Sequence, residues 1–464
     1  MFETICALIP GDPDCPPRAR RLDLLQRVLN GTLYDALPYQ FHEERSPGGE
    51  YIPLRSRRPS VRYALPRIVV EDSVALLFSE GHFPAIDCAD AALRATLATL
   101  ARETRLNAVM IDAAIRGSIG SVAILMRILR GRVFFSVLDS IHLIPLWRAD
   151  APDTLASVSE RYKVRGAILA AQGYDIADPA AEYWFMREWD GAAETWYLPW
   201  PVAQPETPPR IDAARTIRHD LGFVPIARVR NLPGGDETDG ACTFRAAIET
   251  SIEIDYQLSQ AGRGLKYSSD PTLLIKEPAT SDSEIVKGAG NALVVSEKGD
   301  AKLLEIGGTA AAAVIDYVRT LRELALESIH GNRANAQRVS AAPSGRALEL
   351  LNQGLVWLAD NLRISYGEGA LLDLARMVVA ASARYPLLIG GRPVGALPQD
   401  APLSLKWPRW HPPTAQDRNL DAATLTALVG SKLLSRDSAM QTLAAIYDIA
   451  DPGAEAARIA QDPP

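Results

Sequence analysis

The residue types that could carry out chemistry are few in this chain and widely scattered. It has six histidines and four cysteines in 464 residues. The most suggestive strings are His42-Glu43-Glu44 and Arg218-His219-Asp220, whose side chains could serve as general acids and bases. Neighbouring side chains on one element point in different directions, so we interpret both strings as surface residues. No catalytic constellation is predicted, and no cofactor is expected.

The sequence also contains no motif typical of a nucleotide-binding or metal-binding site. The chain lacks a GxxxxGKS/T phosphate loop, a GxGxxG turn, HExxH and GxSxG. Its cysteines have no CxxC spacing, and its histidines are not spaced as metal ligands. This pattern argues against a metal site and a disulfide framework, and it fits a reducing compartment.

Composition narrows the possible partners. Hydrophobic residues make up 47% of the chain, enough for a sizeable core, and the length suggests two to four domains or one large elaborated domain. The net charge of −7 argues against tight binding of duplex DNA, because neutralising phosphates supplies most of that affinity. A conduit in which DNA slides remains compatible with this charge. Without a signal peptide or a membrane-spanning apolar run, we expect a protein that is made in the cytoplasm and does not enter a membrane.

The N-terminal half is expected to be a mixed α/β region. Residues 1–60 show weak periodicity and are interpreted as an arm. The basic patch that follows is interpreted as a solvated face, with contact to DNA or another subunit as the alternative; it comprises Arg55, Arg57, Arg58, Arg62 and Arg67. Apolar spacing predicts helices over 91–106 and 107–117. Hairpins are predicted over 121–138 and 183–200, where paired tryptophans indicate cross-strand packing, with a carbohydrate platform as the alternative.

The second half is expected to be built from long helices. Helical spacing predicts one over 241–268 and another over 309–330, with Gly331 at the C-cap. The polar insert between them, 276–308, is predicted to form a β-hairpin that turns at 297–300. A polar loop follows at 332–342. Next comes a helical stretch over 346–385, which we expect to break near Ile364 because Ser365 and Glu368 have capping-box spacing. The tail is predicted to be helical from about residue 421.

This order of elements resembles that of tailed-bacteriophage portal proteins, most closely the branch typified by siphophages of Gram-positive hosts. The segments that carry the resemblance are Tyr63–Phe78, Ser118–Ala123 with His142–Pro145, Ile248–Asp270, Pro343–Leu348, and Leu433–Met440 with Asp448–Pro452. The likeness runs from about residue 60 onward, and it rests on the order of weak motifs.

The resemblance implies an α+β, portal-like fold: a mixed α/β wing, two long stem helices with an inserted β-containing clip, and a helical C-terminal crown. The implied boundaries are wing 1–240, first stem helix 241–275, clip 276–308, second stem helix 309–331, tunnel loop 332–343, kinked helix and return to the wing 344–417, and crown 418–464.

The same resemblance implies a non-enzymatic subunit of a closed ring, typically dodecameric, at the capsid vertex of a virion. Its partners would be other copies of itself, terminase, a head–tail adaptor, capsid and scaffold proteins, and DNA that passes weakly through the channel. The tunnel-loop residues would be Asn332, Arg333, Asn335, Gln337, Arg338 and Ser340. The clip residues that dock partners would be Asp282, Glu284, Lys287, Glu297, Lys298 and Asp300. Another structural or scaffold protein, or a soluble hydrolase, remains as the alternative.

Overall fold

The computed structural model contains both helices and sheets, and it divides into two compact units. It describes residues 1–204, 206–236, 238–269, 272–278, 295–304, 309–331, 352–410, 415–447, 449 and 452–461. The larger unit spans 1–332 and 354–408, and the smaller one contains the C-terminal helices. The fold therefore agrees with the expected mixture of α and β structure.

The N-terminal sixty residues are part of the main core and do not form a free arm, so that expectation was wrong. Helices α1 (Phe2–Leu8) and α2 (Pro17–Leu29) bury Ile5 and Leu22, along with other apolar side chains, in the largest core cluster. The sequence does contain a short pattern that predicts helix α2: Pro17 stands at its first turn, ahead of leucines at helical spacing.

The basic patch is likewise not a uniformly solvated face. Arg57 is only 1% exposed, and its guanidinium donates to the backbone oxygens of Ile52 and Phe41. Arg58 bonds the Leu37 oxygen in the same way, at 2.5 Å. These arginines use their several donors to satisfy carbonyl groups of the irregular 30–63 segment.

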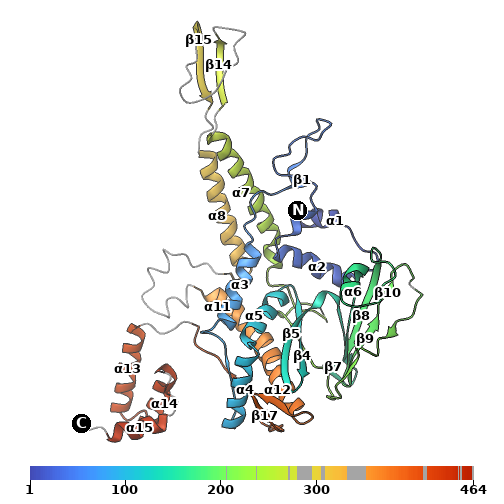
Figure 1. The fold of residues 1–464 in the computed structure, drawn as a ribbon. Helices are drawn as coiled ribbons and strands as arrows, with labels where there is room; N and C mark the ends of the chain where they lie inside the picture. The colour runs from blue at the N-terminus through green and yellow to red at the C-terminus, as the bar shows by residue number, and fades with distance from the viewer. Residues whose placement is uncertain are drawn as a thin grey trace. The chain divides into compact units, whose positions relative to one another are not determined.

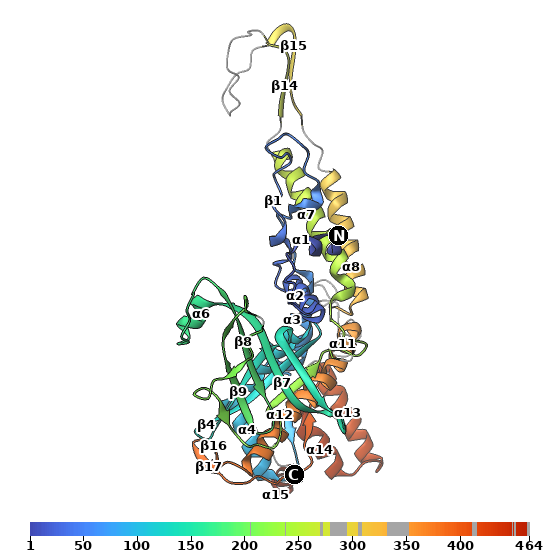
Figure 2. The same ribbon diagram turned by 90° about the vertical axis from the view of Figure 1, so that its right-hand side faces the viewer.

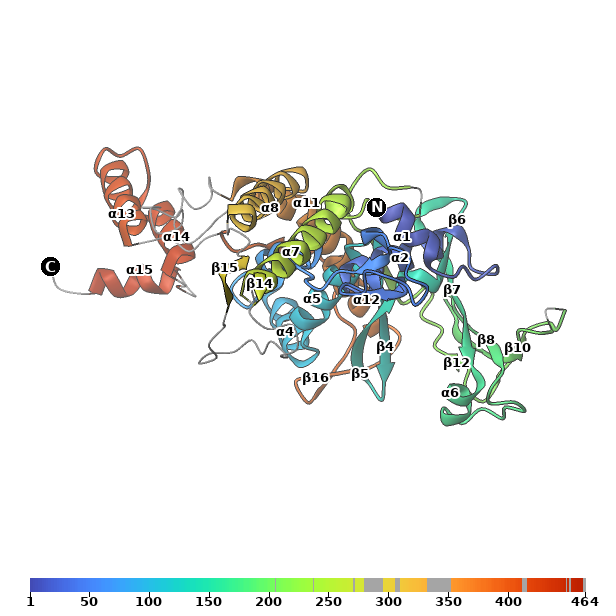
Figure 3. The ribbon, with the colours of Figure 1, turned by 90° about the horizontal axis from the view of Figure 1, so that it is seen from above.

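Two antiparallel sheets follow, as the hairpin patterns predicted. The smaller consists of β4 (Ser121–Leu129), β5 (Arg132–Asp139) and β13 (Ile226–Arg230). The larger is ordered β11-β9-β8-β7-β6, with β10 and β12 paired to it. Its strands are β6 (Leu143–Arg148), β7 (Ala151–Arg165), β8 (Glu182–Trp189), β9 (Ala193–Leu198), β10 (Trp200–Pro201), β11 (Arg210–Ile211) and β12 (Ile217–Arg218). In Figures 1 and 3, β4 and β5 lie between α5 and the larger sheet.

The tryptophans of the larger sheet are packed rather than displayed. Trp184, Trp189 and Trp200 are at most 9% exposed. Arginine side chains lie over several of the rings; that of Arg161 is 4.2 Å from the Trp184 ring centre. Cross-strand packing, which the sequence favoured over a carbohydrate platform, therefore describes these residues.

Three helices pack beside the small sheet: α3 (Leu65–Phe78), α4 (Ala91–Glu103) and α5 (Leu106–Gly117). Helix α5 contacts β4 and β5 directly, while α3 and α4 pack against α5. The ranges of α4 and α5 are close to the predicted ones. Asp90 caps α4 by accepting from the backbone N–H groups of Ala92 and Leu93. A short pairing of β3 (Ala85–Asp87) with β18 (Ser404–Lys406) brings the chain's later part back to this layer.

The two long helices are present, and the insert between them contains paired strands. Helices α7 (Ile248–Ser269) and α8 (Thr309–Ser328) run side by side in Figures 1 and 2. The first ends at Ser269, beside the predicted end at 268, although the implied stem segment ran on to 275. Strand β14 (Thr272–Pro278) follows it and pairs antiparallel with β15 (Val295–Leu304).

A third helical stretch stays continuous where a break was predicted. Helix α11 (Gln353–Leu362) passes into a π-helical segment, η5 (Arg363–Leu371), and then into α12 (Leu372–Ser382). The capping-box residues Ser365 and Glu368 therefore lie inside a helix. Strands β16 (Leu387–Ile389) and β17 (Arg392–Val394) form the hairpin that follows. In the smaller unit lie α13 (Ala415–Gly430), α14 (Arg436–Tyr447) and α15 (Pro452–Gln461).

Candidate functional site

The hairpin between α7 and α8 holds half of the residues predicted for partner docking. Glu297, Lys298 and Asp300 all lie within β15, and the side chains of Lys298 and Asp300 are exposed. Asp300 is the cross-strand partner of exposed Lys276 on β14. Opposite charges at such a position favour the pairing of the two strands. Asp282, Glu284 and Lys287 lie outside the described residues.

The predicted turn of this hairpin was wrong. Residues 297–300 were expected to connect two strands, but they form the interior of β15. The strand that pairs with 300–304 is 272–276, most of which the boundaries implied by the resemblance placed in the first stem segment, 241–275. The short apolar run Thr272–Ile275, which begins and ends with a β-branched residue, was the available signal.

All six residues predicted for the tunnel loop lie outside the described residues: Asn332, Arg333, Asn335, Gln337, Arg338 and Ser340. The structure does describe the turn that leads to them. Gly331 donates its N–H to the Leu326 oxygen at 2.8 Å, after His330 in the left-handed conformation. A Cβ atom at Gly331 would stand 2.6 Å from the Leu326 side chain and 3.1 Å from that of Val69. The residue with the left-handed backbone is His330 and helix α8 ends at Ser328, so Gly331 lies beyond the C-cap position that was predicted for it.

Helix α7 is bound to the N-terminal part of the chain by a strap, residues 57–63. The Tyr256 hydroxyl donates to the Arg57 oxygen at 2.8 Å, and the Val61 N–H donates to the Ser259 hydroxyl at 3.0 Å. Asp255 accepts from the Tyr63 N–H at 2.7 Å and from the Tyr34 hydroxyl at 2.8 Å. These bonds join residues about two hundred positions apart and attach the middle of α7 to the N-terminal part of the chain.

Asp255 is a buried carboxylate whose hydrogen-bond donors are neutral groups. Burial raises its pKa, and the hydrogen bonds from Tyr63 and Tyr34 offset only part of that effect. Burial also raises the pKa of Tyr34. Both groups stay in a closed network, which is typical of a structural anchor and not of an acid–base pair open to substrate.

Helix α8 differs from its neighbour because apolar side chains remain on its surface. Ile315, Tyr317 and Leu324 are 40%, 48% and 56% exposed. Near its C-terminal end the helix is anchored, with Leu326 buried and Arg322 donating to the Tyr63 hydroxyl at 3.0 Å. Tyr317 and Leu324 are seven residues apart and so lie on the same side of the helix, and we call these two residues the α8 apolar face; Ile315 lies on the opposite side. Exposed apolar side chains on one side of a helix are typical of a surface that another molecule covers.

The π-helical segment is held in the middle of the larger unit. Tyr366 is fully buried and donates its hydroxyl to the Asn231 side-chain oxygen at 3.0 Å. The Asn231 amide in turn donates to the Ala241 oxygen and the Thr243 hydroxyl, at 2.8 and 2.9 Å. Arg363 lies over the Trp407 ring, and burial lowers its pKa to about 10. The π-helical turn is thus held by side-chain contacts of Tyr366 and Arg363 with residues outside the helix.

A second buried polar cluster surrounds Asp239. Arg18 contacts its carboxylate at 2.7 and 2.8 Å, and Arg228 and Ser121 contact it at 3.2 and 2.5 Å. Burial alone would raise the pKa of Asp239, but the hydrogen bonds from Arg18 and Ser121 hold it below its usual value. This cluster joins α2 to β4 and β13.

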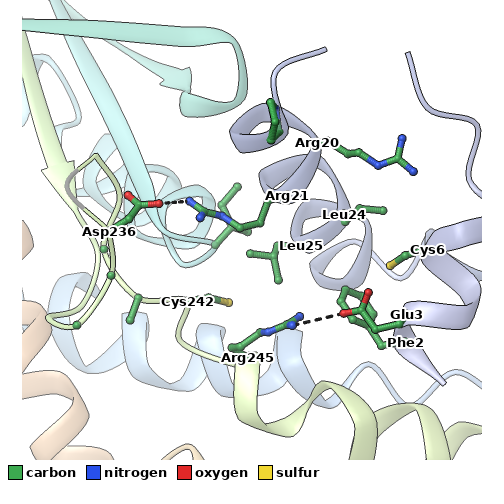
Figure 4. Close-up of a pocket in the computed structure, with 16 residues that line it drawn as sticks. Phe2, Glu3, Cys6, Arg20, Arg21, Leu24, Leu25, Asp236, Cys242 and Arg245 are labelled. Carbon is green, nitrogen blue, oxygen red and sulfur yellow. Dashed lines mark hydrogen bonds and ion pairs between the residues drawn. The ribbon is translucent and has the colours of Figure 1, made fainter. Parts of the chain in front are cut away.

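A cavity of about 600 Å³ lies between α1, α2 and the 234–245 segment. Figure 4 shows Cys6 and Cys242 on different walls, with Arg21 directed at Asp236 and Arg245 at Glu3. Burial raises the pKa of Cys6 to about 11 and that of Cys242 to about 12. Both thiols are therefore protonated near neutral pH and are poor nucleophiles.

The strings that could have been catalytic do not assemble into a site. Arg218 pairs with Asp220 at 3.0 Å, while the His219 ring is half-buried and has a pKa lowered by burial. Within the described ranges, no group of three or more His, Cys, Asp or Glu side chains could hold a metal ion. Across those same ranges, no helix combines the length and the apolarity needed to cross a bilayer.

A comparison with models of known protein families finds a match for this chain. The model of the family described as "Phage portal protein, SPP1 Gp6-like" matches residues 18–462. No curated protein matches the chain.

Solved structures align over nearly the whole length at low similarity. A chain from the virion of a native gene transfer agent particle is 14% identical, with a TM-score of 0.41, and the match covers 94% of this chain and 96% of that one. A chain from the neck of the native particle, computed with C12 symmetry, is also 14% identical with a TM-score of 0.39, and the coverages are 95% and 98%.

Proposed function

This chain belongs to the SPP1 Gp6-like family of phage portal proteins, and we propose that it forms the ring at a capsid vertex through which DNA is packaged and later ejected. The observation that carries the proposal is the family match, which spans residues 18–462. Supporting it, α8 carries an apolar face that the subunit itself leaves exposed. In a ring, heterologous contacts with the neighbouring copy would cover such a face, and closure by rotation leaves no copy with an open surface.

We assign the parts of the portal to segments of the chain. Helices α7 and α8 form the stem, and the two sheets with their covering helices form the wing. The β14–β15 hairpin belongs to the clip, residues 332–343 form the tunnel loop, and α13 to α15 form the crown. The strap on α7 supports this assignment, because a stem that transmits force between clip and wing needs a firmly held base.

The clip would dock the packaging motor and, afterwards, the head–tail adaptor. Exposed Lys276, Lys298 and Asp300 give the hairpin charges of both signs. Charged rims favour rapid, reversible association and exclude wrong partners, which suits two partners that bind the same surface in turn.

DNA would pass through the ring without being gripped. The chain carries a net charge of −7, so phosphate contacts from a few loop arginines such as Arg333 and Arg338 would be weak and short-lived. The role is one of assembly and conduction, and no chemical step is required of the subunit.

Negative-stain electron microscopy of the purified protein, with light scattering on the same sample, tests this proposal. We expect rings with a central hole and a mass of about a dozen subunits, as the family resemblance implies. Leu324→Glu should prevent ring formation while leaving the circular-dichroism spectrum and melting temperature unchanged, because Leu324 is 56% exposed.

Ile168→Glu is the matched control. Ile168 is 51% exposed on the short helix α6 (Gly166–Ala171), away from the α8 apolar face, and its substitution should leave the rings intact. A protein that stays monomeric at every concentration and salt condition would contradict the proposal. Rings that persist unchanged in Leu324→Glu would rule out the α8 apolar face as an interface.

A further inference from the structure

The chain just before the strap presents a large aromatic side chain in a fixed position. Tyr51 is 68% exposed, and the Arg57 guanidinium lies 5.2 Å from its ring centre. That guanidinium is itself held in place, because Arg57 is 1% exposed and bonds the oxygens of Ile52 and Phe41. A cation–π contact with a buried arginine orients the tyrosine ring and leaves most of its surface in solvent. Exposed, well-ordered tyrosines are frequent among the residues that contribute most to protein interfaces.

The segment that carries Tyr51 is closed upon itself and attached to α7. Arg45 and Tyr51 form an antiparallel bridge between their backbones. Glu44 forms an ion pair with Arg263, near the C-terminal end of α7. We call residues 44–55 the Tyr51 loop. Its attachments give the Tyr51 ring a defined place beside the long helix.

The Tyr51 loop and α8 lie on opposite sides of α7. Figures 1 and 3 show α7 between the blue N-terminal segment and α8. The two helices are antiparallel neighbours, so Arg263 near the end of α7 is level with the first half of α8, which contains Tyr317. Subunits of a closed ring are related by rotation, which brings different patches from opposite sides of the subunit together. With the stem along the ring axis, rotation keeps each patch at its height, and these two patches meet.

The charges of the two sides are complementary. Residues 51–63 contain no acidic residue and four arginines: Arg55, Arg57, Arg58 and Arg62. The exposed charged side chains of α8 comprise three acidic residues and one basic residue: Asp316, Glu323, Glu327 and Arg319. An acidic helix attracts a basic segment of the next copy, whereas two copies of α8 placed face to face would repel each other. The charges therefore favour a contact of α8 with the N-terminal segment over a contact of α8 with α8.

We propose that the α8 apolar face of one copy packs against the Tyr51 loop of the next copy in the ring, with the Tyr51 ring against Tyr317. The contact rests on the proposed function, because it exists only in the ring, and it names the surface that covers α8. It also gives a role to the basic segment 51–63, which would lie beside the acidic side chains of the neighbouring α8. The N-terminal part of the chain would thus take part in assembly.

Cysteine cross-linking in assembled rings tests this contact. The full chain with Tyr51→Cys and Tyr317→Cys is treated with a short bismaleimide reagent, and covalent dimers are measured on a denaturing gel. We expect dimers and longer multimers, because a link between neighbouring copies joins two chains. Tyr51→Cys with Ile315→Cys is the matched control and should show a loss of these products, since Ile315 lies on the opposite side of α8. Both variants contain the same native cysteines, so only the position on α8 differs.

A single substitution gives an independent measurement. Tyr51→Ala should raise the protein concentration needed for half-maximal ring assembly about tenfold, the effect of removing one central interface residue. The melting temperature of the dissociated subunit should not change, because Tyr51 is 68% exposed. Ile168→Ala, at 51% exposure on α6, should leave assembly unchanged.

Two results would overturn the contact while leaving the proposed function intact. In the first, rings form but the Tyr317 pair yields no more covalent dimers than the Ile315 pair. In the second, Tyr51→Ala assembles at the same concentration as the native protein. A native protein that forms no rings would contradict the proposed function, and this contact with it.

Discussion

Helices α7 and α8 are neighbours of similar length, 22 and 20 residues, yet their surroundings are opposite. Along α7, Ile252, Tyr256 and Ser259 are almost completely buried beneath the N-terminal strap and helices. Along α8, Ile315, Tyr317 and Leu324 remain exposed. The difference shows that contacts within the subunit bury these α7 side chains and leave the three α8 side chains in contact with solvent.

The two helices should therefore respond differently to identical substitutions. Changes on α7 should act on the stability of the isolated subunit, because they remove contacts within it. Changes on α8 should have little effect on that stability and should act on assembly. Matched residue pairs on the two helices allow this contrast to be tested.

The isoleucine pair should show the largest contrast. Ile252→Ala should lower the free energy of unfolding by about 2–4 kcal/mol, since Ile252 is 2% exposed and its loss leaves a cavity. Ile315→Ala, at 40% exposure, should change it by less than about 0.5 kcal/mol. Urea denaturation of dissociated subunits measures both. Equal losses would mean that α8 is as firmly packed within the subunit as α7.

The tyrosine pair isolates a single hydroxyl. Tyr256→Phe removes the hydrogen bond to the Arg57 oxygen and should destabilise the subunit by about 1 kcal/mol. Tyr317→Phe on α8 should leave the stability unchanged, because that side chain is 48% exposed. The same denaturation experiment compares them. If Tyr256→Phe is neutral, the strap contributes nothing measurable to holding α7.

Asp255 should make the strap sensitive to pH. Its pKa is raised in the folded state, so its contribution to stability is fully present below the unfolded value of 3.8 and is lost as the pH rises through the folded value. Asp255→Asn cannot titrate. Stability measured by urea denaturation between about pH 7 and about pH 4 should therefore improve for the native protein relative to Asp255→Asn as the pH falls. Parallel pH profiles would show that Asp255 is ionised as easily as in water.

The smallest effect on stability is expected at the hairpin. Lys276→Ala removes one exposed member of the Lys276–Asp300 cross-strand pair, and exposed pairs of this kind contribute little. The melting temperature should not change. Binding to terminase, measured by biolayer interferometry with assembled rings, should weaken if the hairpin docks that motor, and Glu323→Ala on α8 serves as the control. A clear loss of stability would show that the Lys276–Asp300 pair contributes to the folding of the isolated subunit.

Local patterns were sufficient for much of the fold. Apolar spacing placed α4, α5, α7 and α8 within a few residues, apart from the start of α7. The hairpin predicted over 121–138 is the β4–β5 pair, and its turn residues Arg130 and Gly131 both have positive φ. Such signals depend on neighbouring residues only. They failed where a long-range contact opposed a local rule: Ser365 and Glu368 have capping-box spacing, but Tyr366 between them is buried against Asn231, and the helix stays continuous as a π-turn.

For the candidate site, the sequence by itself determined which segments are polar, helical or extended and, through family resemblance, what kind of protein this is. Only the tertiary structure decided that side chains of α7 are buried within the subunit and that side chains of α8 remain exposed. Asp255 meets Tyr34 across 221 residues, and β4, β12 and the Tyr385 segment meet at one cavity. Contacts at such separations depend on the folding of the whole chain, because each is formed only when the intervening elements have packed, and no local periodicity encodes them.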